Sequence, residues 1–296
     1  YTPAVSERLV LNAGDYGLAV QERAELIMLS DIAGYVGADT CGCLLAIRQD
    51  QQEEISLMID IGTNGEMVLG NRERMVTCST AAGPAFEGAK IECGMRGAAG
   101  AVDHVKYEDG KWNYTTVGNK PAVGLCGSGL IDLVAGLLDA GMLDENGVLR
   151  SGQEKQGVFI LVLPERGGNE RGVYLTQKDL GEVQLAKAAI AAGIQMLMER
   201  LGITEDDICS VYIAGAFGNY MDPVSAGKIG LFPATLVKKV KPVGNAAGEG
   251  AKIALVNEKE MLEMDELVRK IEFVELAASA DFQDHFIDEL GFETGE

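Results

Sequence analysis

Apolar and polar residues alternate in short runs between residues 55 and 79, and this pattern predicts three β-strands. The strands are expected over residues 55–61, 65–70 and 74–79, which carry many aliphatic and β-branched side chains. The segments TNG and NRER between them contain turn-forming residues. Short strands joined by tight turns predict an antiparallel meander.

A period of about 3.6 residues, typical of an α-helix, is clearest between residues 176 and 202. Apolar residues recur at this spacing: Leu180, Val183, Ala186, Ile190, Ile194, Leu197 and Leu201. Thr176 and Asp179 have the spacing of a capping box, and Gly202 is suited to the end of a helix. We therefore expect one long, amphipathic helix here.

Strands and helices alternate along the rest of the chain, while residues 1–23 give no clear pattern. An apolar segment from residue 25 precedes a helix expected over 37–47. Further helices are predicted over 128–140, 245–257, 258–270 and 278–290. Strands are predicted over 157–163, 172–176, 208–215, 237–244 and 271–276, and a hairpin at Asp109-Gly110 within 101–117. This order predicts an α/β protein with a mixed sheet flanked by helices.

The charge of the chain limits what it binds. Its 296 residues carry a net charge of −20, which repels nucleic acids and anionic lipids. No apolar run reaches the roughly 18–20 residues that span a membrane. Six cysteines without a C-x-x-C pair and two histidines give no zinc or iron–sulfur pattern. We expect a cytoplasmic protein that binds neither nucleic acid nor membrane.

The segment DIGTNGE joins the first two strands of the meander. Asn64-Gly65 is a pair that favours a type I′ hairpin turn. A turn flanked by Gly62 and Gly65 can also present successive backbone N–H groups to an anion, with Thr63 and Asn64 as further donors. Asp60, at the strand end, is a candidate ligand for Mg²⁺. A plain hairpin and a phosphate-binding loop are both consistent with these residues, and one turn can be both.

A second glycine-rich segment, GLCGSGLID, precedes the helix expected over 128–140. Gly127, Ser128 and Gly129 lie where unsatisfied backbone N–H groups of a helix start can bind an anion, and Ser128 is a candidate N-cap. Close helix packing through small residues explains the same pattern. The segment lacks the Gly-Lys-Ser/Thr ending of a P-loop.

Two further glycine-rich segments, IAGAFGN and VGNAAGEGA, each follow a predicted strand. Small residues at a strand end allow a base or ribose to lie against the backbone, although a plain exit from the strand has the same composition. The residues concerned are Gly215, Ala216, Phe217 and Gly218 in the first segment and Gly244 and Asn245 in the second.

These segments, in this order, resemble those of a known family. DIGTNGE after a strand, followed downstream by IAGAFG, resembles the superfamily of acetate and sugar kinases, heat-shock ATPases and actin. Five more segments make the resemblance specific to one branch: GYVGADT, CSTAAGPAFEGA, CGSGLID, LTQKDL and VGNAAGEGA. That branch is the C-terminal ATPase region of the reductive activators of corrinoid proteins, and the resemblance spans residues 34–251.

The resemblance implies an actin-like, ribonuclease H-like ATPase lobe. It implies that residues 1–54 are a remnant of the first ATPase half with a connector, and that residues 55–296 form the second, nucleotide-binding half. A two-iron two-sulfur domain and a first D-I-G-T-T loop are expected only N-terminal to Tyr1.

The resemblance also implies a function. Members of this family use ATP to reduce the inactive cobalt(II) of a corrinoid protein to cobalt(I), with an electron supplied by the iron–sulfur domain. The corrinoid protein docks on the ATPase part. The implied cofactors are therefore ATP and Mg²⁺, the implied partner is a cobalamin-binding protein, and a homodimer is compatible with the family.

The resemblance assigns Asp60, Gly62, Thr63, Asn64 and Gly65 to phosphate or Mg²⁺ contacts, and Gly215, Ala216 and Gly218 to adenosine contacts. The remaining candidates come from the segments themselves. Asp60 and Glu66 are the catalytic candidates, and Asp60 is also the metal ligand. The loop and helix-start residues Gly62, Thr63, Asn64, Gly65, Gly127, Ser128 and Gly129 are assigned to the nucleotide, as are Gly215, Ala216, Phe217, Gly218, Gly244 and Asn245. Cys78, Ser79 and Thr80 are expected on the face that meets the corrinoid protein, with buried packing of small residues as the alternative.

Other functions remain open at this point. A small-molecule kinase of the same superfamily needs a general base, for which Glu66 and Glu87 are candidates. Another ATP-driven electron activator, or a non-catalytic module that docks the corrinoid protein, has the same sequence features.

Overall fold

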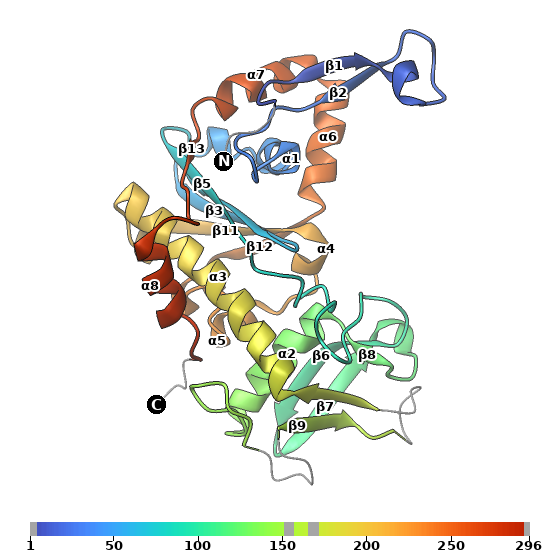
Figure 1. Cartoon of the computed structure of the whole chain (residues 1–296), viewed down its shortest axis with the longest axis vertical. Coiled ribbons are helices and arrows are strands. Elements are labelled where there is room, and N and C mark those ends of the chain that lie inside the picture. The colour runs from blue at the N-terminus through green and yellow to red at the C-terminus, as the bar shows by residue number, and fades with distance from the viewer. Residues whose placement is uncertain (1–4, 151–156, 165–171, 293–296) are drawn as a thin grey trace.

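A six-stranded mixed sheet organises the larger part of the protein (Figure 1). The structure is a computed structural model that describes residues 5–150, 157–164 and 172–292. The strands lie in the order β12–β11–β3–β4–β5–β13. Neighbours β3, β4 and β5 are antiparallel, whereas β11 is parallel to both β3 and β12, and β13 is parallel to β5. Their bounds are β3 Ile55–Ile61, β4 Gly65–Gly70, β5 Met75–Thr80, β11 Ile208–Ala214, β12 Val240–Gly244 and β13 Glu272–Phe273. The predicted meander and mixed sheet are confirmed.

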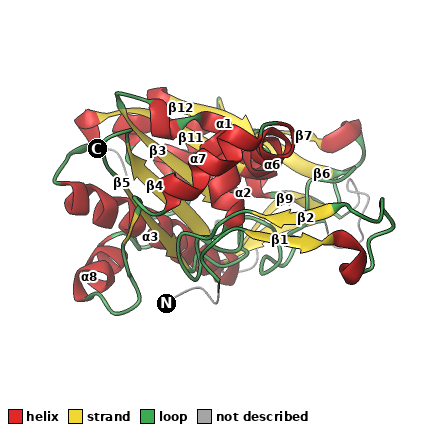
Figure 2. Cartoon of the chain, turned by 90° about the horizontal axis from the view of Figure 1, so that it is seen from above, coloured by secondary structure: helices red, strands yellow, loops and turns green. Residues whose placement is uncertain are grey.

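Helices cover both faces of this sheet (Figure 2). On one face, Met58 and Val68 pack in a cluster with residues of α1, α6 and α7. On the other face, Ile59 and Met67 pack with Ile190 of the long helix α3, and α8 packs on α3. Burial of both faces explains the continuous apolar runs of the central strands. The helices are α1 Ala38–Ile47, α3 Gln177–Leu201, α6 Ala246–Val256, α7 Glu258–Val268 and α8 Ala280–Asp288.

A smaller second part lies below the sheet in Figure 1. Helix α2, Gly127–Asp139, packs on the three-stranded sheet β7–β6–β8, and α5, Pro223–Lys228, packs on α2. A two-stranded sheet, β10–β9, lies beside it. The hairpin between β6 and β7 turns at Asp109 and Gly110, as predicted. The strands are β6 Ala101–Glu108, β7 Lys111–Thr116, β8 Gly124–Leu125, β9 Val158–Val162 and β10 Val173–Thr176.

The long helix α3 begins and ends where the sequence predicts. The Thr176 hydroxyl accepts from the Asp179 backbone N–H, and the Asp179 side chain accepts from the Thr176 N–H. Gly202 ends the helix in a left-handed conformation. Both helix ends therefore satisfy backbone groups that would otherwise lack partners.

Some elements differ from the predictions. Residues 234–239, partly expected as strand, form a 3₁₀ helix, so β12 begins only at Val240. The strand expected over 271–276 is reduced to the two residues of β13. Strand β1, Leu9–Asn12, pairs with β2, Glu25–Met28, in an antiparallel arrangement. No element was assigned from the sequence to the residues of β1.

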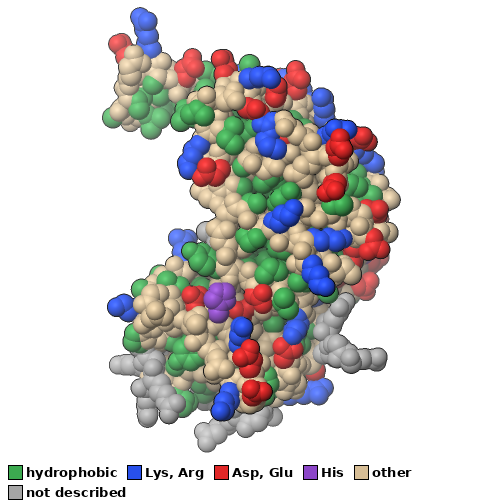
Figure 3. All heavy atoms as spheres, turned by 180° about the vertical axis from the view of Figure 1, so that it is seen from behind, with side chains coloured by type: hydrophobic (Ala, Val, Ile, Leu, Met, Phe, Trp, Pro, Cys, Tyr) green, Lys and Arg blue, Asp and Glu red, His purple; other side chains and the backbone are tan. Residues whose placement is uncertain are grey.

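The outer surface carries acidic and basic side chains of both signs, with acids in excess overall (Figure 3). In the same view the outline is indented between the upper and lower parts. Among the described residues, no helix has the length and apolar character needed to cross a bilayer.

Two glycines allow α1 and α6 to approach closely. A Cβ on Gly250 would overlap the Gly42 backbone, and a Cβ on Gly42 would lie 2.8 Å from the Ala247 carbonyl oxygen. Close backbone contact of this kind positions α6, which begins immediately after β12. Gly250 of the segment VGNAAGEGA therefore serves helix packing.

We expect Gly250→Ala to lower the free energy of unfolding by about 1–3 kcal/mol, because the new methyl group must push the two helices apart. Gly181→Ala in α3 is the matched control, since its Cβ meets no atom within 4 Å. That change should instead raise stability by about 0.5–1 kcal/mol, because alanine loses less backbone entropy in a helix. Urea unfolding of the two variants measures both effects, and equal destabilisation by both would contradict the packing argument.

Candidate functional site

Three parallel strands end at the same edge of the main sheet. Asp60, at the end of β3, is paired in register with Ala214 at the end of β11, and Ala214 is paired with Gly244 at the end of β12. Carboxyl ends of parallel strands are where ligands of open α/β sheets bind. Three of the predicted segments, DIGTNGE, IAGAFGN and VGNAAGEGA, thus converge here.

Asp60 lies beside helix α1. One carboxylate oxygen is 3.8 Å from the Cys43 thiol, and a Cβ on Gly215 would approach the other oxygen to 3.0 Å. Burial raises the pKa of Asp60, and the nearby Asp39 carboxylate adds to this rise. Asp39 and Cys43 were not predicted as site residues, although GYVGADT, which contains Asp39, was one of the segments that carried the resemblance.

Gly215 shows why glycine is needed beside Asp60. Its φ of 88° lies in the left-handed region that other residues rarely adopt. The chain turns there from β11 directly into the short helix α4, Gly215–Gly218. The resulting close approach leaves the Asp60 carboxylate beside bare backbone.

The connection between β3 and β4 is a three-residue loop and not the type I′ turn that the pair Asn64-Gly65 favours. Ile61 pairs with Gly65, and the Gly62 N–H donates to the Asn64 carbonyl oxygen at 2.9 Å. Neither Asn64 nor Gly65 has a positive φ, which a type I′ turn requires. Thr63 at the tip donates its hydroxyl to Glu87 at 2.6 Å.

Gly65 and Gly218 have packing roles. A Cβ on Gly65 would lie 3.0 Å from the Thr80 hydroxyl and 3.2 Å from Ile190, and a Cβ on Gly218 would be 2.6 Å from Ile213. The pattern of small residues thus partly reflects crowding inside the fold, which sequence alone does not separate from ligand contact.

Phe217 and Asn245 have defined partners at the edge. The Phe217 ring stacks on Phe86, with centroids 5.7 Å apart and an interplanar angle of 17°. Asn245 caps α6 by accepting from the Gly248 N–H at 3.0 Å. Ala216 lies within α4.

The start of α2 is packed closely against its surroundings. A Cβ on Gly127 would overlap the Phe86 carbonyl, and one on Gly129 would overlap the Val102 carbonyl. The prediction of Ser128 as the N-cap is wrong, because Cys126 holds that position. The Ser128 hydroxyl instead donates to the Asp103 carbonyl oxygen at 2.8 Å. The geometry here matches the close-packing alternative.

Glu66 and Ser79 lie beside Asp60 on one face of the sheet, because Asp60, Glu66 and Ser79 are in register on β3, β4 and β5. The Ser79 hydroxyl donates to Glu66 at 3.0 Å. Burial raises the pKa of Glu66 to about 7, with Asp39 and Asp60 adding to the rise and the Ser79 hydrogen bond opposing it. The edge therefore carries several carboxyl groups in a poorly solvated setting.

The three residues expected to face a partner do not share one environment. Cys78 is fully buried, with its thiol toward the Gly193 carbonyl of α3, so it cannot meet a partner as predicted. Ser79 and Thr80 line a pocket of about 320 Å³, together with Asn64 of the β3–β4 loop. The aromatic side chains of Tyr35, Phe273 and Phe282 form much of its remaining wall.

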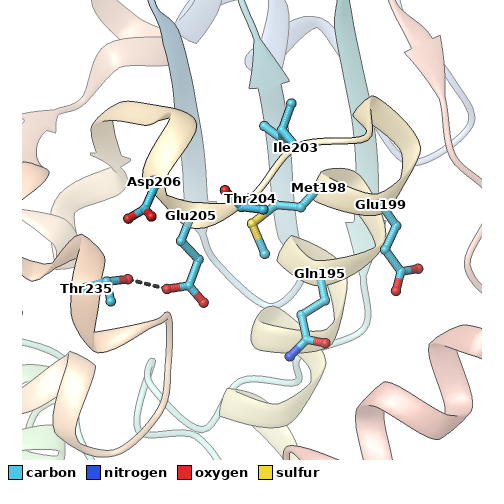
Figure 4. Close-up of a pocket in the computed structure, with 8 residues that line it drawn as sticks. All are labelled: Gln195, Met198, Glu199, Ile203, Thr204, Glu205, Asp206 and Thr235. Carbon is cyan, nitrogen blue, oxygen red and sulfur yellow. Dashed lines mark hydrogen bonds between the residues drawn. The ribbon is translucent and has the colours of Figure 1, made fainter.

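A larger hollow, of about 550 Å³, lies at the opposite end of β11. It is bounded by the end of α3 and by residues 203–206 and 235, and Glu205 accepts a hydrogen bond from Thr235 (Figure 4). None of the predicted site residues lines this hollow.

Asp60 is the residue that the sequence predicts as the Mg²⁺ ligand, and it lies at this edge. Among the residues that the structure describes, no three Cys, His, Asp or Glu side chains form a ready-made metal site. Mg²⁺ usually keeps several waters and is held by one or two carboxylates together with substrate phosphates. Asp60, with its carboxylate beside the bare backbone of Gly215, fits that mode of binding.

Residues 54–296 match the family described as the C-terminal domain of RACo, the ASKHA domain, and residues 1–52 match the RACo middle region. The chain belongs to the RACo family. The ASKHA domain is the actin-like ATPase fold, so the predicted fold class is confirmed and nucleotide binding is a property of this fold.

Known proteins agree with this family assignment. The corrinoid activation enzyme RamQ of Eubacterium limosum is 35 % identical, with 95 % of this chain and 50 % of that protein aligned. A reductase of Methanosarcina barkeri, named for the Co(II) methylated amine-specific corrinoid protein, is 29 % identical over 94 % of this chain and 54 % of its own. A solved structure of a reductive activator for a corrinoid, iron-sulfur protein superposes with a TM-score of 0.91 at 37 % identity, covering 99 % of this chain and 48 % of that one. The chain thus spans about half the length of these RACo relatives.

The raised pKa of Glu66 leads to a prediction about stability. Folded Glu66 holds its proton more tightly than the unfolded chain does, so its contribution to the free energy of unfolding falls as the pH rises from about 4.5 to about 7. Glu66→Gln lacks this titration. The stability of Glu66→Gln relative to the unaltered protein should therefore increase between pH 4.5 and pH 8 in urea unfolding. A difference that stays constant with pH would show that Glu66 has an ordinary pKa.

Proposed function

We propose that this chain is the ATP-binding and partner-docking part of a reductive activator that converts the cobalt(II) of a corrinoid protein to cobalt(I). The observation that carries the proposal is the edge at which Asp60, Ala214 and Gly244 align, in a chain of the RACo family. The names of the relatives refer to corrinoid activation and to a Co(II) corrinoid protein reductase. The electron would come from an iron–sulfur centre outside the residues of this chain.

The nucleotide would lie along this edge, with its phosphates at the β3–β4 loop. Thr63 has a hydroxyl donor at the loop tip, and Asp60 would hold Mg²⁺, directly or through water. When bound, Mg²⁺ neutralises phosphate charge. This need is acute here, because carboxylates of Asp39, Asp60 and Glu66 lie close together and would repel a bare triphosphate.

The adenosine would lie beside the ends of β11 and β12. Gly215 and Gly244 leave backbone uncovered there, and Phe217 adds an aromatic ring half-buried against Phe86. Gly218 and Gly65 are crowded by neighbouring side chains, so we assign them a supporting rather than a contacting role.

The corrinoid protein would dock over the pocket that Ser79 and Thr80 line. This pocket borders Asn64 of the proposed phosphate loop, so nucleotide and partner would meet at adjacent positions. The hydrogen bond from Ser79 to Glu66, which is in register with Asp60, provides a short physical connection between the two positions.

We expect ATP-dependent formation of cobalt(I) in a mixture of the full-length protein, its cobalt(II) corrinoid protein, a reductant and Mg–ATP. Asp60→Ala should lower the affinity for Mg–ATP at least about tenfold, since it removes a charged metal or hydrogen-bonding contact. Asp206→Ala, in the hollow at the opposite end of β11, is the control and should bind normally. The absorbance of cobalt(I) and isothermal titration calorimetry are the two readouts. Equal rates with and without ATP would contradict the proposed role of the nucleotide.

Ser79→Ala should weaken binding of the corrinoid protein while leaving the affinity for Mg–ATP within about twofold. The reason is that Ser79 lines the pocket but lies on β5, one strand further from the nucleotide edge than Glu66. Thr235→Ala, at the hollow at the opposite end of β11, is the control, since Thr235 is far from this pocket. Unchanged corrinoid-protein affinity in Ser79→Ala would remove the support for docking at this pocket.

A further inference from the structure

The carboxylate of Glu87 occupies the hydrogen-bond donor at the tip of the β3–β4 loop. The Thr63 hydroxyl donates to Glu87 at 2.6 Å, a distance typical of a hydroxyl that donates to a charged carboxylate. A hydroxyl has one proton to donate, so it serves one acceptor at a time. A phosphate oxygen bound at this loop would need the same proton.

The backbone that carries Glu87 is held firmly in place. Phe86 is buried and stacked on Phe217, and Ala85 is buried as well. Gly88 leaves no room for a Cβ against the Met95 backbone. The Glu87 carboxylate can therefore leave Thr63 most readily by rotation of its own side chain.

We propose that Glu87 takes the place of a phosphate on the β3–β4 loop in the nucleotide-free protein, and that a nucleotide phosphate binds after the Glu87 side chain turns away. The inference rests on the proposed function of this loop and adds to it a residue that competes with the ligand. Glu87 is then a gate on the phosphate subsite, distinct from the kinase general base considered from the sequence.

Electrostatics strengthens the competition. Asp60 and Glu66 lie at the edge from which the loop projects. Each additional carboxylate there repels a phosphate and lowers its affinity for the loop. Glu87 should therefore reduce the affinity for compounds that carry phosphates at this loop, and should leave the affinity for adenosine alone unaffected.

The test is the affinity of the full-length protein for Mg–AMP-PNP and for adenosine, measured by isothermal titration calorimetry. Glu87→Gln should bind Mg–AMP-PNP about three- to tenfold more tightly, the size expected for one charge and one hydrogen bond near the surface. Its affinity for adenosine should not change. Glu73→Gln is the matched control, because it removes the same charge at the turn between β4 and β5, at the far end of β4.

Thr63→Val separates the proposed contact from a general effect of charge. This variant should bind Mg–AMP-PNP more weakly, and adding Glu87→Gln to it should tighten binding by less than it does in the unaltered protein, because the shared donor is gone and only the effect of the charge is left. Weaker or unchanged binding by Glu87→Gln, or tightening of the same size in the Thr63→Val background, would overturn the inference alone. Absence of Mg–AMP-PNP binding in every protein, the unaltered one included, would contradict the proposed nucleotide site and the inference with it.

Discussion

The parallel pairing of β11 with β3 on one side and with β12 on the other is the constraint on which the candidate site depends. It brings residues more than 150 positions apart in the sequence to one edge, where Asp60, Ala214 and Gly244 stand in register. The hydrophobic contacts of α1, α6 and α7 on one face and of α3 on the other hold these strands together. Without this burial, the three glycine-rich segments would be separate turns with no common ligand.

The acidity of the edge shapes what it can bind. Burial raises the pKa values of Asp60 and Glu66, and Asp39 adds to both effects. A polyanion approaching these groups must bring a cation with it or meet them protonated. A magnesium-complexed nucleotide satisfies this condition, and the ASKHA domain is a nucleotide-binding fold. The same acidity gives Glu87 its proposed importance, since that residue adds another anion at Thr63, the donor nearest the loop tip.

Much of the fold could be predicted because local patterns and tertiary packing agree. The meander, the hairpin at Asp109-Gly110 and the capped helix α3 each carry their own signals, namely alternation, a turn pair and a capping box. Asn64-Gly65 does not form the type I′ turn that this pair favours, because Gly65 belongs to β4 and packs against Thr80 and Ile190. Tertiary contact thus outweighed the preference of a dipeptide.

The site was less predictable than the fold, because the sequence does not distinguish a glycine that makes room for a ligand from one that makes room for a neighbouring helix. Gly127, Gly129 and Gly250 are crowded by backbone atoms, whereas Gly215 turns the chain beside Asp60. Burial of Cys78 follows from its place on the face of β5 toward α3, and that depends on strand register. The contributions of Asp39, Cys43 and Glu87 arise from contacts distant in sequence, which no single motif encodes.

A crystal structure of the full-length protein with Mg–AMP-PNP tests the central claim most directly. The account predicts phosphates at the β3–β4 loop, the metal within reach of Asp60, and the adenosine beside Gly215 and Gly244. A nucleotide seated instead in the hollow formed by Gln195, Met198 and Thr235, at the opposite end of β11, would contradict it.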